Sequence, residues 1–156
     1  KLVENTGYKY DSVYRFCGWE HAGDIRPVKA CGAETIGEFY LACLRAWNTE
    51  TCSERFRPEW SAANPSIGQC TITAALVHEF FGGEVYSVPL DGGGRHSFNY
   101  IDGVFVDLAS EQFGKDALPD FSLAEPADPA SLLTGEDKAE RCALLRERLL
   151  AVLAKH

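Results

Sequence analysis

The sequence predicts a single α+β domain in which helices pack on a small antiparallel sheet. With 156 residues, of which 46% are hydrophobic, the chain can fill one core but is too short for two domains. Strong helical patterns are followed by three strand-like runs, at residues 84–90, 95–101 and 104–109. Asp102-Gly103 joins the last two runs and suits a tight hairpin turn, so neighbouring strands are expected to be antiparallel.

Three helices are expected. From Glu34 to Trp47 apolar residues recur every three or four positions, which gives the helix one apolar side, and Cys43 lies on that side. The helix expected at Cys70–Phe81 is apolar almost all round and ends at Gly82-Gly83, so it belongs in the middle of the fold. The last helix is expected over residues 137–154.

The domain is expected to have three parts: an N-terminal extension (1–33), a core (34–118) and a loop followed by the last helix (119–156). Pro119–Thr134 is predicted to be a surface loop. The extension contains a run of aromatic and aliphatic residues that suggests a strand or an irregular aromatic layer: Tyr8, Tyr10, Val13, Tyr14 and Phe16. Asn48–Gly68 forms a loop of about twenty residues, a length that is often functional.

Charge and hydropathy limit the partners. A formal net charge of -8, without clustered Lys and Arg, argues against a nucleic-acid partner. No apolar run has the length of about 18 residues that a membrane span needs, and the first residues lack the apolar region of a signal peptide. The expectation is therefore a soluble cytoplasmic protein with no membrane partner, and export as an effector is the alternative.

The cysteines are expected to be free thiols in a reducing compartment, because their spacing is wide and uneven. They are Cys17, Cys31, Cys43, Cys52, Cys70 and Cys142. Two disulfides remain open as alternatives, Cys17 with Cys31 and Cys43 with Cys52. A zinc site at Cys17, His21 and Cys31 is a weaker alternative, because the spacing C-x3-H-x9-C matches no structural zinc pattern. No metal or cofactor is expected.

The hairpin turn predicts which residues share a face of the sheet. The expected facing pairs are Ile101 with Val104, Tyr100 with Phe105, Asn99 with Val106, and Phe98 with Asp107. Alternation then puts His96 and Asp107 on one face as diagonal neighbours, about 7 to 8 Å apart at the backbone. An imidazole beside a carboxylate is the orienting half of a catalytic triad, because the carboxylate fixes the tautomer of the ring.

Cys70 supplies the nucleophile of this interpretation. At a helix N-terminus a thiolate gains from the partial positive charge and the unpaired N–H groups, which lower a thiol pKa from about 8.5 towards neutrality. The same N–H groups offer a site for an oxyanion. His78 is eight residues further along the helix, displaced by about 12 Å, and is too far away to serve as the base.

Four stretches together resemble a known family. NPSIGQC, an apolar helix ending in FFGGE, then GGGRHSFN and VDLASEQF are similar to the YunG-like family of small bacterial proteins, over roughly Trp47 to Gly114. The order Cys, His, Asp on a helix start and two strands also resembles papain-like cysteine peptidases and their relatives, including transglutaminases and arylamine acetyltransferases. The resemblance implies one papain-like domain with a triad of Cys70, His96 and Asp107.

Papain-like enzymes also hold the oxyanion with an amide side chain upstream of the nucleophile, and Asn64 and Gln69 are the two candidates here. The expected function is a cysteine-dependent hydrolase that acts on a peptide or protein acyl substrate, by cleavage of an amide, isopeptide or thioester or by glutamine deamidation. Two alternatives stay open: an acyltransferase or transglutaminase-like enzyme, and a non-catalytic binding module on a papain-like shell.

Overall fold

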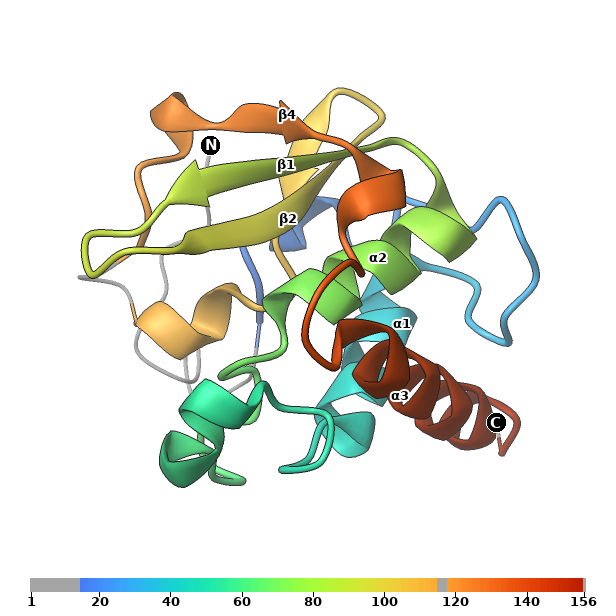
Figure 1. Ribbon diagram of the computed structural model, residues 1–156. Coiled ribbons are helices and arrows are strands. Elements are labelled where there is room, and N and C mark those ends of the chain that lie inside the picture. Colours follow the sequence, from blue (N-terminus) through green and yellow to red (C-terminus); the bar gives the residue numbers. More distant parts are fainter. Residues whose placement is uncertain (1–14, 115–117, 156) are drawn as a thin grey trace.

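A computed structural model describes residues 15–114 and 118–155 (Figure 1). Its α-helices are α1 (Ile36–Ala46), α2 (Cys70–Phe81) and α3 (Lys138–Leu153), and its strands are β1 (Glu84–Pro89), β2 (Arg95–Ile101), β3 (Val104–Val106) and β4 (Glu125–Ala127). Short 3-10 helices connect them: η1 (Trp19–His21), η2 (Glu54–Glu59), η3 (Ser110–Phe113), η4 (Phe121–Leu123) and η5 (Pro129–Ser131). The prediction of a mixed α+β chain is confirmed.

The predicted helices are present: α2 has the expected bounds, and the ends of α1 and α3 differ from the expected ones by one or two residues, as is usual for helix ends. Gly82 takes a φ of 73° at the end of α2, a conformation that glycine adopts without strain. Cys43 is fully buried on the apolar side of α1, as predicted. Of the predicted aromatic layer, Phe16 is buried, and Tyr8, Tyr10, Val13 and Tyr14 lie outside the described residues.

The strands form one antiparallel sheet in the order β3-β2-β1-β4. The predicted hairpin register is confirmed for Ile101 with Val104, Tyr100 with Phe105 and Asn99 with Val106. Asp102 and Gly103 have φ values of 52° and 82°, the positive dihedrals that a two-residue hairpin turn requires.

Two sequence predictions about the sheet were wrong. β3 ends at Val106, so the expected pairing of Phe98 with Asp107 is absent from the ladder, and the Asp107 N–H instead donates to the Cys17 carbonyl at 2.9 Å. Pro119–Thr134 is not all loop, because β4 pairs with β1 and places Pro126 opposite Tyr86. A three-residue edge strand that contains proline gives no alternating pattern to detect.

The elements are arranged so that α2 lies between the sheet and the other two helices (Figure 1). On one side of α2, the Asn99 amide of β2 donates to the Ala74 carbonyl at 3.0 Å. On the other side, Phe39 of α1 packs against Phe80 and Phe81, and α3 closes the same apolar core. None of the helices in the described ranges combines the length and apolarity needed to cross a membrane.

Candidate active site

Cys70 is the first residue of α2 and lies where β2 begins. Its thiol interacts with the ring of His96, the backbone of Ser97 and the hydroxyl of Thr71, the last at 3.7 Å. Among the described residues no side chain caps the start of α2, and the first turn carries no acidic residue. The N–H groups of this turn are therefore free of side-chain competition for a bound anion.

His96 and Asp107 are brought together by the β2–β3 hairpin. His96 Nε2 lies 2.6 Å from Asp107 Oδ2, and both side chains are only 1% exposed. The second carboxylate oxygen, Oδ1, accepts the Ala109 N–H at 3.2 Å. Because Nε2 faces the carboxylate, Nδ1 is the ring nitrogen left to face Cys70. Phe113 packs edge-on against the ring at 4.7 Å between centroids, which further fixes the orientation of the ring.

The electrostatics of the pair favour a thiolate and an imidazolium. Burial by itself raises the pKa of the Cys70 thiol, but the charge of His96 and hydrogen bonds from His96, Ser97 and Thr71 lower the pKa to about 7. Burial likewise lowers the pKa of His96, and the charges of Asp107 and Cys70, with hydrogen bonds to both, raise it to about 10. Since the imidazole has the higher pKa, the ring holds its proton more tightly than the sulfur does, and a substantial fraction of Cys70 is ionised at neutral pH.

Cys70 differs from the other five cysteines. It is partly exposed, whereas the others are buried, and all six are free thiols, so neither of the two disulfides left open from the sequence is formed. Burial raises the pKa of Cys17 to about 12 and the pKa values of Cys52 and Cys142 to about 11, and it also raises those of Cys31 and Cys43. At pH 7 Cys70 is therefore the cysteine with a substantial thiolate fraction.

No metal site accompanies these thiols. Within residues 15–114 and 118–155, no three His, Cys, Asp or Glu side chains are grouped to hold a metal ion, and this includes Cys17, His21 and Cys31. Cys17 instead takes part in the backbone support of Asp107, and its own N–H donates to the Ser110 hydroxyl at 2.9 Å.

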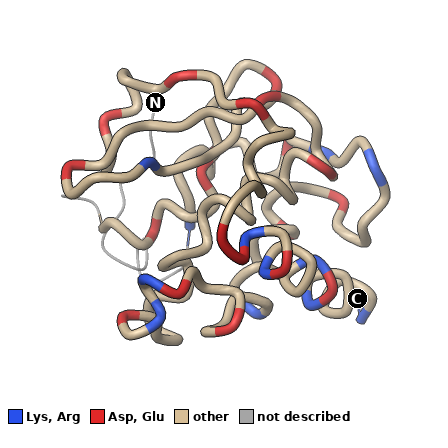
Figure 2. The backbone as a smooth tube through the Cα atoms, in the orientation of Figure 1, with Lys and Arg blue, Asp and Glu red and all other residues tan. Residues whose placement is uncertain are grey.

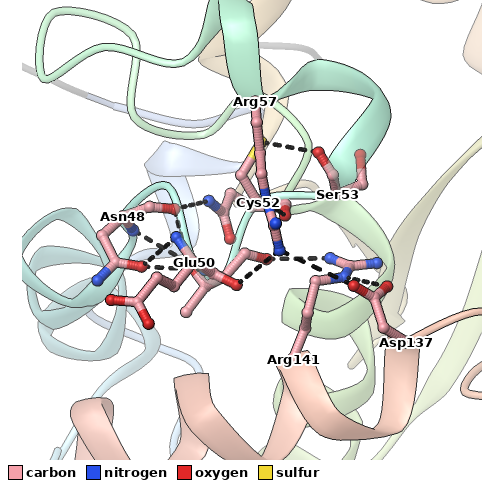
Figure 3. A network of polar contacts seen from close by, with 9 residues as sticks. Asn48, Glu50, Cys52, Ser53, Arg57, Asp137 and Arg141 are labelled. Atoms are coloured by element: carbon pink, nitrogen blue, oxygen red, sulfur yellow. Dashed lines mark hydrogen bonds and ion pairs between the residues drawn. The ribbon is translucent and has the colours of Figure 1, made fainter.

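The loop before the nucleophile is anchored by a polar network that the sequence did not predict (Figure 3). The Gln69 side-chain amide donates to the Asn48 carbonyl at 3.1 Å, and Asn48 Oδ1 accepts the Thr51 N–H at 2.9 Å. Arg141 of α3 donates to the Thr51 carbonyl at 3.0 Å and pairs with Asp137 at 2.9 Å. This chain of contacts ties the residue before Cys70 to a helix at the other end of the sequence.

The two candidates for the oxyanion amide have different surroundings. The Gln69 amide nitrogen is engaged by Asn48, so that side chain anchors the loop. Asn64 is 5% exposed, and its Oδ1 has no hydrogen-bond partner in the described part of the chain. Its backbone is fixed by a turn in which its N–H donates to the Ser61 carbonyl at 3.0 Å. The Gln69 Oε1 also has no partner within the described residues, so the two side chains differ in that the donor nitrogen of Gln69 is already engaged by Asn48.

Gly68 sets the approach of the loop to Cys70, and its replacement by alanine is expected to destabilise the protein. Gly68 has a φ of +70°, and a Cβ there would lie 2.5 Å from Sγ of the buried Cys52. The strain and the clash together should lower the free energy of unfolding by about 1 to 3 kcal/mol, measured by urea denaturation. Gly23→Ala is the matched control, because a Cβ at Gly23 meets nothing within 4 Å. Equal stability of the two variants would contradict the prediction.

Comparison with known proteins places the sequence of this chain in a family. The sequence model of the family described as "YunG protein" matches residues 35–154. A protein of Bacillus subtilis (strain 168), named "Uncharacterized protein YunG", is 35% identical over 69 residues. That match covers 44% of this chain and 55% of the relative, so it spans about half the length of the relative. No solved structure matches the chain significantly.

Proposed function

This chain belongs to the YunG family, and we propose that it is a cysteine-dependent hydrolase of peptide or protein acyl substrates. One observation carries the proposal: the partly exposed thiol of Cys70 has its pKa lowered to about 7 by His96, whose ring is held by Asp107 at 2.6 Å. A catalytic triad consists of a nucleophile that is hydrogen-bonded to a base, which is in turn hydrogen-bonded to an orienting acid.

The proposed reaction proceeds through an acyl-enzyme. The Cys70 thiolate attacks the carbonyl carbon of an amide, isopeptide or thioester, and the carbonyl electron pair moves onto oxygen. When the oxyanion collapses, the bond to the leaving group breaks and the His96 imidazolium gives its proton to the departing amine or thiol. Water then attacks the thioester while His96 takes a proton from it, and the acid and the Cys70 thiolate are released. Deamidation of a glutamine follows the same steps with ammonia as the leaving group.

The oxyanion is proposed to bind at the start of α2. The Cys70 N–H is the first donor, and the helix dipole adds partial positive charge at this end of α2. The side-chain amide of Asn64 or Gln69 is the second candidate donor, and Asn64 is favoured because the Gln69 amide nitrogen already donates to the Asn48 carbonyl.

A papain-like fold is part of the same proposal. A nucleophilic cysteine at the start of a central helix, with the histidine on β2 and the acid directly after the end of the neighbouring antiparallel strand β3, supports that assignment. The sheet that packs on α2 has four strands, in the order β3-β2-β1-β4.

Alkylation with iodoacetamide tests the proposal. Because the thiolate is the reactive form, the rate at Cys70 should fall about tenfold per pH unit below the pKa of about 7 and level off above it. At pH 7 the other five cysteines should react at least about 100-fold more slowly, since their pKa values are raised and they are buried. Peptide mass spectrometry of the native protein measures the rates, and the urea-unfolded protein is the control. Uniform or absent labelling of the native protein would instead favour a non-catalytic binding module.

A further inference from the structure

A cavity of about 430 Å³ is lined in part by Phe113, the residue whose ring packs against His96. Its walls come from the loop after β1, from η3, and from the segment that leads into η4. Four of the lining residues are large and apolar, and two are acidic: Leu90, Phe113, Leu118 and Leu123, with Asp91 and Asp120. A cavity of this size holds a single large side chain or a small ligand.

The cavity is joined to the triad through Phe113. The Phe113 ring lines the cavity and packs against His96 at 4.7 Å between ring centroids. Pro89, which also lines the cavity, pairs with Arg95, the residue before His96. A substrate group in the cavity would therefore contact the Phe113 ring, which in turn packs against the general base. Leu123 is 54% exposed although it is large and apolar, so this wall presents an apolar surface to whatever enters.

Both charged residues that line the cavity in the described part of the chain are acidic. Asp91 lies in the loop between β1 and β2, and Figure 2 shows acidic colouring at the tip of this hairpin. The Asp120 carboxylate is held by the Ser122 N–H at 3.0 Å and by the Ser122 hydroxyl, and these bonds lower the pKa of the Asp120 carboxyl. The nearby Arg95 guanidinium is directed to the Ser87 hydroxyl at 2.9 Å and pairs with Glu125.

We infer that this cavity binds a basic side chain of the substrate, lysine or arginine, next to the carbonyl that Cys70 attacks. The inference rests on the proposed hydrolase function. The apolar stem of such a side chain would pack against Phe113 and Leu123, and its cationic end would meet Asp91 and Asp120. An acidic side chain would be repelled by the two carboxylates, and a wholly apolar one would cover them without pairing their charge.

Three affinity reagents test the inference: the Nα-acetyl chloromethyl ketones of lysine, norleucine and glutamate. In each, the Cys70 thiolate displaces chloride, so a C–S bond forms as the C–Cl bond breaks. Norleucine keeps the length of the lysine stem and lacks its charge. We expect the lysine reagent to label Cys70 about threefold to tenfold faster than the norleucine reagent, and the glutamate reagent to be slowest. Intact-mass and peptide mass spectrometry at pH 7.5 measure the rates.

Two charge variants and a matched control complete the test. Asp91→Asn and Asp120→Asn should each bring the ratio of lysine to norleucine rates towards one, and asparagine keeps the capping oxygen that Asp120 supplies to η4. Asp128→Asn is the control, because Asp128 caps η5 through the Ala130 N–H as Asp120 caps η4, and it does not line the cavity. This variant should leave the ratio unchanged.

The basic-side-chain inference and the hydrolase proposal would be overturned by different results. Equal rates with all three reagents, or a lysine preference that both variants retain, would overturn the basic-side-chain inference and leave the hydrolase proposal in place, since Cys70 would still be labelled. Native Cys70 that reacts with none of the reagents faster than the same cysteine in the urea-unfolded protein would overturn both.

Discussion

Cys70→Ser is expected to lower the kcat/KM for hydrolysis of an Nα-acetyl-norleucine thiobenzyl ester by about 10⁴-fold or more. The change keeps the size and position of the side chain. It removes the ionised sulfur, because a serine hydroxyl is not deprotonated by a neighbouring imidazole at neutral pH. Release of the thiol product at pH 8 measures the rate, and a thermal melt verifies that the fold is retained.

Cys31→Ser is the control for this experiment. Cys31 is a buried thiol whose pKa is raised by burial, and its sulfur makes only a weak contact with the Ala33 carbonyl. Its replacement should leave kcat/KM within about twofold of the original, in line with a substitution outside the reacting groups. Should Cys70→Ser keep most of the thioesterase activity, Cys70 would not be the nucleophile and the proposed reaction would be wrong.

Asp107→Asn is expected to lower kcat/KM by about 10³-fold and to raise the apparent pKa of Cys70. Asparagine retains the oxygen that accepts the Ala109 N–H but presents an amide where Oδ2 now meets His96. The negative charge that raises the pKa of His96 is lost, so the ring is protonated less readily and stabilises the thiolate less. The pH dependence of iodoacetamide labelling should shift to higher pH, a change that simple destabilisation would not cause.

Glu111→Gln provides the matched comparison for Asp107. Glu111 is another buried acid four residues along the chain, and burial raises its pKa to about 8. Its carboxyl acts on the pKa of Cys17, which lies beside Asp107. A carboxyl with this pKa is largely protonated at pH 7, so its replacement by glutamine removes little charge and should leave the labelling profile of Cys70 in place. If Glu111→Gln shifted the profile as much as Asp107→Asn, the special role of Asp107 would be refuted.

The sequence predicted the elements whose signals are local. α2 was bounded by the apolar run from Cys70 and by Gly82-Gly83, and the hairpin register followed from Asp102-Gly103 because both residues must take positive φ. Counting outward from that turn placed His96 and Asp107 on one face, and the structure brings their side chains into contact.

The features that the sequence did not predict depend on contacts between distant segments. Arg141 and Thr51 are 90 residues apart, and neither has a neighbour along the chain that marks the other as its partner. The packing of Phe113 on His96 likewise needs η3 to turn back over the sheet after β3. Among these features that the sequence did not predict, β4 alone has a local sequence signal. That signal is misleading, because Pro126 argues against a strand at every position except an edge.

The contact between Arg141 and the Thr51 carbonyl has a consequence for biosynthesis. During translation Cys70 leaves the ribosome well before α3, and domains tend to fold as units. The segment that anchors Gln69 cannot be locked until Arg141 has emerged, and the imidazole and carboxylate of the hairpin must also be in place. We therefore expect Cys70 to keep the ordinary pKa of a thiol in the nascent polypeptide and to gain its lowered pKa once these segments have folded together.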